Sequence, residues 1–158
     1  FYEGSACILT PTARTAPAVL DLARRFWEAL GSRVVVADPV RHDQLLAGVS
    51  HLPHLLASAL MQTLARGNEN FDEIVAIAGS GLRDTTRIAA SDPDIWRQIA
   101  IENAPALLGR LDRLQAVLAE WRAALDRATP DGRAIAQFFA EGREARLRLE
   151  NPDDRSGE

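Results

Sequence analysis

The sequence has a single cysteine, no long hydrophobic run and no strongly basic segment, and each absence excludes a class of protein. Cys7 has no second cysteine for an internal disulfide, which is typical of a reducing compartment. No apolar run reaches the roughly 18 residues of a membrane span, and nothing resembles a signal peptide. The formal net charge of −4 disfavours a nucleic-acid partner. We therefore expect a cytoplasmic protein that contacts neither membrane nor nucleic acid.

A Gly-rich phosphate-binding loop is also missing from the sequence. The nearest approach is Gly79-Ser80-Gly81, which follows a helical pattern, whereas a dinucleotide fingerprint follows a strand. No residue is therefore assigned to a cofactor.

What the chain does contain is enough apolar sequence for one folded domain. It has 158 residues, of which 47% are hydrophobic, and a domain near this size buries roughly 70% of its unfolded surface. It begins at Phe1, without an initiator methionine, and runs directly into an apolar segment. From this start we expect the sequence to be part of a longer chain.

The first 39 residues have the pattern of a strand, a helix and a second strand. Residues 6–9 and 34–37 are short apolar runs, each closed by a segment that contains proline. The apolar residues of 17–30 recur at helical spacing, with Thr15 as the expected N-cap and Gly31 as the residue expected to end the helix. Short links between them predict a right-handed crossover with parallel strands. Because parallel sheets need more strands, we expect the edge of a larger α/β domain.

From Asp38 onward the pattern is helical. Asp38 and Pro39 are expected to begin a helix that is apolar on most sides and continues to about residue 66. Pro53 is expected to kink it and to free backbone carbonyls near residues 49 and 50. A further helix is expected to begin at Asn70. The fold class is therefore mainly α, with a strand–helix–strand remnant at the start.

The longest expected helix begins at Asp92 and continues to about residue 127, with a bend at Pro105. Its apolar positions alternate spacings of four and three, in the order Leu107, Leu111, Leu114, Leu118, Trp121 and Leu125. Such a helix would be roughly 50 Å long, more than a small domain can cover. Part of this row of six apolar residues, called the seam below, is therefore expected to contact another subunit. A last helix is expected after Pro130, with Ile135, Phe138, Phe139 and Leu147 facing inward.

Residues 79–96 form an unusually polar connector between two apolar helical patterns. It combines a flexible Gly-Ser-Gly start with cations and hydroxyls, including Arg83, Asp84, Arg87 and Ser91. An arginine fork near a core suits a small carboxylate, because its two N–H groups match the two oxygens. The alternative is a solvated loop with a local pair between Asp84 and Arg87.

The second polar group lies on the helix that contains Pro53. Ser50 and His54 share a helical face, and His51 lies one step round. His54 is interpreted either as a core histidine bonded to a backbone carbonyl or as an imidazole that faces a ligand. Trp96 is interpreted either as core or as one wall of a pocket.

A metal site is a further alternative. His42-Asp43 is a dipeptide of helical metal-dependent phosphohydrolases, and His51, His54 and Asp84 could complete a cluster. That motif needs a histidine upstream of the pair, and His42 is the first histidine here. No metal is therefore expected.

Together these segments resemble the C-terminal region of the prephenate dehydrogenase family, which includes arogenate-using relatives. The resemblance is carried by Ser50-His51-Leu52-Pro53-His54, by Gly-Leu-Arg-Asp-Thr-Thr-Arg-Ile-Ala at residues 81–89, and by Ser91-Asp92-Pro93 with Trp96. Residues 8–12 and 38–43 match as well, so the resemblance covers about residues 6–125.

The resemblance implies an oxidoreductase of tyrosine biosynthesis. Members couple a Rossmann-type domain that binds NAD or NADP to a helical domain that forms a homodimer, with the substrate between them. A hydride is removed, carbon dioxide leaves and an aromatic product forms. Prephenate gives 4-hydroxyphenylpyruvate and arogenate gives tyrosine, and that choice stays open. The family's catalytic histidine lies in the Rossmann part and matches nothing here, so this chain alone is expected to be inactive.

The resemblance also implies domains and site residues. Residues 1–39 would be the edge of the nucleotide-binding domain, 40–150 the helical substrate-binding and dimerisation domain, and 151–158 a polar tail. The expected substrate-binding residues include Ser50 and His54, which would line the site from the kinked helix, and Trp96, which would form one wall. Arg87 would bind the substrate carboxylate, and Asp84 would belong to the ionic network that orders Arg87. Some of these residues could serve the site of the neighbouring subunit. The alternative is a non-catalytic helical dimerisation module that senses a metabolite.

Overall fold

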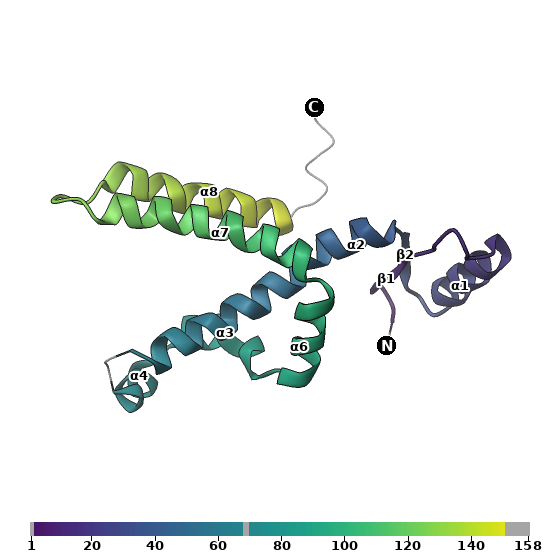
Figure 1. Ribbon diagram of the computed structural model, residues 1–158, viewed down its shortest axis with the longest axis horizontal. Helices are drawn as coiled ribbons and strands as arrows, with labels where there is room; N and C mark the ends of the chain where they lie inside the picture. Colours follow the sequence, from purple (N-terminus) through teal and green to yellow (C-terminus); the bar gives the residue numbers. More distant parts are fainter. Residues whose placement is uncertain (1, 68–69, 151–158) are drawn as a thin grey trace. The chain divides into compact units, whose positions relative to one another are not determined.

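The computed structural model describes residues 2–67 and 70–150 and is mainly helical (Figure 1). Its internal contacts divide the chain into two compact units, Phe1–Arg110 and Leu111–Glu158. No helix among the described residues is long and apolar enough to cross a membrane. The predicted tail at 151–158 lies outside the described residues, and the predicted division at residue 39 stays a prediction.

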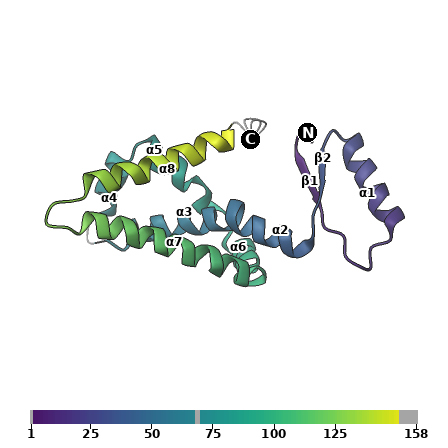
Figure 2. The ribbon, with the colours of Figure 1, turned by 90° about the horizontal axis from the view of Figure 1, so that it is seen from above.

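The predicted crossover unit is present at the start of the chain (Figure 2). Strands β1 (Ala6–Leu9) and β2 (Arg33–Val36) are parallel, and helix α1 (Pro17–Ala29) connects them. Gly31 follows the helix with φ +85, and a Cβ there would lie 3.1 Å from the Cα of Glu3. Glycine is therefore required at this turn, because L side chains rarely adopt that backbone conformation.

The predicted cap of α1 was wrong. Ala16, and not Thr15, precedes the helix, and it makes no side-chain cap. The Thr15 hydroxyl instead accepts a hydrogen bond from the Thr12 N–H at 3.0 Å. Pro17 at the first helical turn reduces the need for a cap, since it has no N–H to satisfy.

The predicted helix from Asp38 to about residue 66 has an irregular centre. It comprises α2 (Pro39–Leu46), a π-helical turn η1 (Ala47–His51) and α3 (Leu52–Ala65). The carboxylate of Asp38 accepts from the Arg41 N–H at 3.0 Å, so the expected cap is confirmed. The irregularity lies in the turn before Pro53, because proline fits the start of the next regular segment and disrupts the turn before it.

The polar connector is helical, which corrects the loop prediction. Asn70 caps α4 (Phe71–Ile77) by accepting from the Asp72 N–H at 3.1 Å. Helix α5 (Ser80–Thr86) and the 3-10 turn η2 (Arg87–Ala90) then occupy most of the connector. Thr86 donates its hydroxyl proton to the Leu82 carbonyl at 2.7 Å, so this donor is satisfied within the helix and is not free for a ligand.

The expected single helix from residue 92 to 127 is two helices, α6 (Pro93–Glu102) and α7 (Ala104–Leu125). Asn103 separates them with φ −105 and ψ 23. The physical reason is Pro105, which cannot donate to the preceding turn, so the chain breaks where a bend was expected. The 50 Å length is therefore wrong, although the seam residues from Leu107 to Leu125 do lie on one helix.

The second unit begins at Leu111 and contains the rest of α7, a loop and helix α8 (Gly132–Glu150). The two helices diverge from this loop (Figure 2). Near the loop the ring of Trp121 contacts the rings of Phe138 and Phe139, with centroids 5.2 and 4.8 Å apart. Phe139 is nevertheless 67% exposed, and Leu147 is exposed as well. In the single chain Phe139 contacts Trp121 but stays largely exposed, and Leu147 does not face inward as predicted, because the helices spread apart toward their far ends (Figure 2).

Candidate functional site

A cavity of about 320 Å³ lies within the first unit, between α3, η2, α6 and the start of α7. Apolar side chains form most of its wall: Leu55, Ala59, Ile88, Ala89, Ile99 and Leu107. The polar members of the wall are His51, His54, Ser58, Gln62 and Ser91. The cavity is therefore an apolar chamber with a few polar groups, the usual composition of a small-molecule site.

His54 and Trp96 form the flat wall of this cavity. Their rings stack, with centroids 3.5 Å apart and planes 19° from parallel. The Nδ1 atom of His54 lies 3.0 Å from the Ser50 carbonyl oxygen. Because a carbonyl only accepts, Nδ1 must carry the proton, and the Nε2 atom of neutral His54 is left as an acceptor. His54 thus makes the carbonyl bond predicted for a core histidine and also lines the cavity, while its role in facing a ligand stays a prediction.

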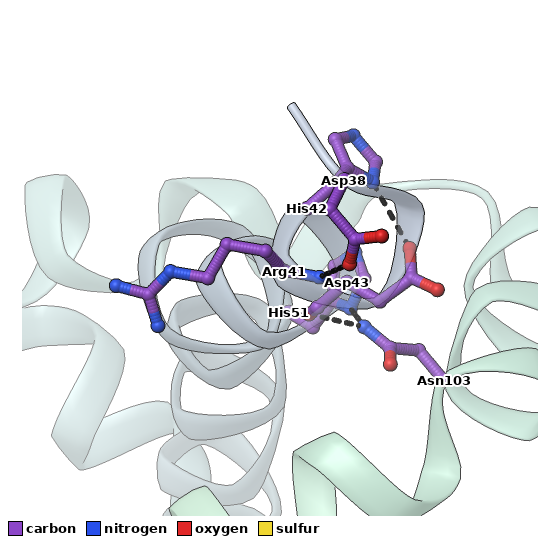
Figure 3. A network of polar contacts seen from close by, with 6 residues as sticks. All are labelled: Asp38, Arg41, His42, Asp43, His51 and Asn103. Carbon is purple, nitrogen blue, oxygen red and sulfur yellow. Dashed lines mark hydrogen bonds and ion pairs between the residues drawn. The ribbon is translucent and has the colours of Figure 1, made fainter. Parts of the chain in front are cut away.

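His51 is the second imidazole of the wall, and a polar network holds it from outside the cavity (Figure 3). The Nδ2 atom of Asn103 lies 2.8 Å from the Asp43 carbonyl oxygen and 3.0 Å from Nδ1 of His51. His42 and Asp43 form an adjacent pair, with Nδ1 and Oδ1 2.9 Å apart. His51 also meets Trp96 edge-on, with ring centroids 6.2 Å apart.

The pKa of His51 is lowered from its ordinary value of 6.5. Burial is the main cause, because removing water disfavours the imidazolium. The charge of Asp43 raises the pKa in part, and the other two histidines, His42 and His54, lower it. His51 is therefore neutral at pH 7, in agreement with an Nδ1 atom that accepts a hydrogen bond from Asn103.

The structure brings together two of the five predicted site residues. His54 and Trp96 line the cavity, whereas Ser50 participates through its backbone carbonyl. Asp84 and Arg87 are exposed and lie outside the lining, although Ile88 and Ala89, the next two residues, belong to it. The side chains of these two charged residues form no hydrogen bond or ion pair with another described residue. The expectation that Arg87 and His54 face one cavity is not met within the single chain.

His51 and Asn103 were not among the predicted substrate-binding residues, although His51 was a candidate metal ligand. The signal for His51 was present, since it lies three residues before His54 in Ser50-His51-Leu52-Pro53-His54. Asn103 carried only a weak signal, its place two residues before Pro105, and its contact with His51 spans 52 residues of sequence. A contact at such separation cannot be derived from helical periodicity.

The candidate metal ligands do not form a cluster. Within residues 2–67 and 70–150, no group of three or more histidine, cysteine, aspartate or glutamate side chains could hold a metal ion. His42 and Asp43 pair with each other, and His51 is bonded to an asparagine amide. The described residues of the cavity wall offer a ligand apolar contact, stacking and hydrogen bonds.

Comparison with known proteins gives the family. The family model described as prephenate dehydrogenase, dimerization domain, matches residues 38–140. A cyclohexadienyl dehydrogenase of Zymomonas mobilis is 37% identical over 155 residues, which cover 97% of this chain and 52% of that protein. A prephenate dehydrogenase of Bacillus subtilis is 30% identical over 111 residues, covering 70% of this chain and 30% of the relative.

Solved structures agree with the sequence relatives. The Aquifex aeolicus prephenate dehydrogenase in complex with hydroxyphenyl propionate and NAD+ matches with a TM-score of 0.84 and 33% identity, over 94% of this chain and 51% of that one. The Synechocystis arogenate dehydrogenase matches with a TM-score of 0.74 and 27% identity, over 97% and 53%. The chain spans about half the length of the Zymomonas, Aquifex and Synechocystis proteins and 30% of the Bacillus protein. It belongs to the prephenate dehydrogenase family, and residues 38–140 are the part that matches the family's dimerization domain.

Proposed function

We propose that this chain is the substrate-binding and dimerisation part of an NAD(P)-dependent prephenate dehydrogenase. The observation that carries the proposal is the apolar cavity walled by His54 and Trp96, in a chain that aligns over 97% of its length with a cyclohexadienyl dehydrogenase. The reaction is the oxidative decarboxylation of prephenate to 4-hydroxyphenylpyruvate. Arogenate is the alternative substrate, because an arogenate dehydrogenase is among the structural matches.

The residues of this chain would bind and shelter the substrate, while the chemical step would take place at the junction with a nucleotide-binding domain. The two-stranded sheet offers no Gly-rich turn for a dinucleotide, so the cofactor is assigned to that other domain. Prephenate carries two carboxylates and a hydroxyl. An arginine fork suits a carboxylate, and Arg87 has no partner among the described residues that would compete for it. The apolar wall would exclude water and so strengthen these polar contacts.

Activity of the complete protein tests this function. The protein is titrated with prephenate and with arogenate, each in the presence of NAD+ or NADP+, and the reduced cofactor is followed by absorbance. We expect reduction with at least one pair, and no reduction by this chain alone. Binding of prephenate without any cofactor reduction would instead support the metabolite-sensing module, the non-catalytic alternative.

We propose in addition that the protein is a homodimer joined through the helical domain. Leu118 and Leu125, two members of the predicted seam on α7, are 55% and 54% exposed in the single chain. Uncovered apolar side chains that repeat along a helix favour a partner helix. The matched family model is named for a dimerization domain.

A pair of substitutions on one helix tests the dimer. Leu118→Glu places a charge on the seam and is expected to give monomers by light scattering at micromolar concentration. Val117→Glu is the matched control, because Val117 is 48% exposed but lies one residue round the helix. A dimer that survives Leu118→Glu, or a wild-type protein that is monomeric, would reject the seam as the interface.

A further inference from the structure

We propose that Asn103 is a positioning residue that fixes the tautomer of His51, so that His51 presents its Nε2–H to the cavity as a hydrogen-bond donor for a ligand oxygen. The proposed occupant is a small ring-bearing acid, and in this respect the inference rests on the proposed function. The tautomer itself follows from contacts within the chain and does not depend on which reaction the protein catalyses.

The first step concerns the orientation of the Asn103 amide. Its Nδ2 atom lies 2.8 Å from the Asp43 carbonyl oxygen. Because that oxygen can only accept, the atom facing it must be the NH2 group and not the amide oxygen. The orientation of the amide is thus determined by a backbone group that cannot change its role.

The second step concerns His51. The same NH2 group lies 3.0 Å from Nδ1 of His51, and its second proton is free for that contact. Nδ1 must therefore accept, which places the single proton of the neutral ring on Nε2. Since His51 lines the cavity and Asn103 occupies its Nδ1 side, Nε2 is the ring nitrogen left for a ligand.

The third step concerns how firmly Asn103 and His51 are held. Asn103 is the C-cap residue of α6 and immediately precedes α7, so its backbone is fixed by two helices. His51 ends the π-helical turn η1. Arg110 donates to the Gln44 carbonyl at 3.0 Å, in α2 just before this turn. Gly48 leaves room for that arginine, because a Cβ there would lie only 3.1 Å from the guanidinium carbon.

The arrangement gives the cavity two imidazoles of opposite character. His54 donates from Nδ1 to the Ser50 carbonyl, so its neutral Nε2 accepts, whereas the Nε2–H of His51 donates. A ligand oxygen without a proton can therefore bond to His51 but not to neutral His54. Asn103 would in this way influence which polar group of the ligand lies on which side of Trp96, without touching the ligand itself.

Nuclear magnetic resonance of the complete protein tests the tautomer. Long-range nitrogen–proton spectra of histidine-labelled protein distinguish a protonated from an unprotonated Nδ1. We expect His51 to have an unprotonated Nδ1 and His54 a protonated one, and we expect Asn103→Ala to abolish the preference at His51. Asn70→Ala, which removes a helix cap away from the cavity, is the matched control and should leave both rings unchanged. A protonated Nδ1 on wild-type His51 overturns the inference.

Binding of hydroxyphenyl propionate in the presence of NAD+ tests the donor role. His51→Gln can still accept from Asn103 and donate to the ligand, so its dissociation constant should stay within about threefold of wild type. His51→Phe and Asn103→Ala should each weaken binding about tenfold. Should Asn103→Ala not fold, the tautomer of wild-type His51 tests the positioning role and the pair of His51 variants tests the donor role.

The outcomes separate this inference from the proposed function. Binding that is unaffected by His51→Phe overturns the donor role and leaves the proposed function standing. Weaker binding in Asn103→Ala with an unchanged His51 tautomer overturns the positioning role. Failure of the wild-type protein to bind the acid, with the expected tautomers observed, rejects the proposed function and the ligand role together.

Discussion

The two halves of the candidate site differ in how the single chain treats their polar groups. The half formed by α3 and α6, called the enclosed half below, is partly buried, and there His51 and His54 each have a hydrogen-bond partner inside the chain. The exposed half consists of the side chains of Asp84 on α5 and Arg87 at the start of η2, which form no hydrogen bond or ion pair with another described residue. Burial requires polar groups to be satisfied, whereas exposed charges can be satisfied by water.

The two imidazoles are therefore preorganised for a ligand, whereas the guanidinium of Arg87 is available to one. The imidazoles are held in fixed orientations because their partners are a carbonyl and an amide of the same chain. A guanidinium that is not engaged inside the chain remains free to bind a ligand or a second subunit, but its geometry is not fixed in advance. We therefore expect the enclosed half to govern stability and the exposed half to govern binding.

The largest expected effect concerns the stacked wall of the enclosed half. Trp96→Ala removes the ring that lies 3.5 Å from His54 and leaves a void between α3 and α6. We expect the free energy of unfolding to fall by about 2–3 kcal/mol, less than for a fully buried tryptophan because Trp96 is half-buried. Chemical denaturation measures the change. Ile95→Ala, at a side chain 57% exposed on the same helix, is the control and should cost well under half as much.

The next effect concerns the exposed half. Arg87→Ala in the complete enzyme should raise KM for prephenate about 10- to 100-fold, since a charge-assisted contact with a carboxylate contributes about 1.5–3 kcal/mol. Stability should not change, because the side chain is exposed. Arg97→Ala, at an exposed arginine that pairs with Asp94, is the control for loss of positive charge. Unchanged kinetics for Arg87→Ala would remove this residue from the site.

A smaller effect concerns pH and the enclosed half. Because the pKa of His51 is lowered by folding, the unfolded chain binds a proton more readily than the folded one. The stability linked to this group is fully present above pH 6.5 and is lost as the pH falls from there through the lowered pKa of the folded state. His51→Gln should flatten that part of the stability profile. An unfolding series between pH 7.5 and pH 5 measures it, and parallel profiles would contradict the prediction.

The smallest effect concerns Asp84. Asp84→Asn removes an exposed carboxylate that forms no hydrogen bond or ion pair with a described residue, so the free energy of unfolding should change by less than about 0.5 kcal/mol. If Asp84 helps to order Arg87 in the assembled enzyme, KM should still rise by about threefold. A loss of stability comparable to that of Trp96→Ala would show that the exposed half also supports the fold.

Much of the local structure could be predicted from the sequence, since it depends on neighbours along the chain. The parallel strands, the caps at Asp38 and Asn70, and the inclusion of His54 and Trp96 in a candidate site all rest on short-range patterns. The helical state of the polar connector was missed because its glycines and hydroxyl residues suggest a loop. The break at Asn103 was underestimated, as Pro105 within an otherwise helical pattern allows either a bend or an end.

The sequence by itself determined the order and type of most elements, because periodicity, capping residues and prolines act within a few residues of one another. It also carried the family motifs. The tertiary structure alone decided which polar groups meet: Asn103 reaches Asp43 and His51 across 60 and 52 residues, and Arg87 stays outside the cavity that Ile88 lines. Contacts of this kind depend on how helices pack against one another, and no local pattern encodes that geometry.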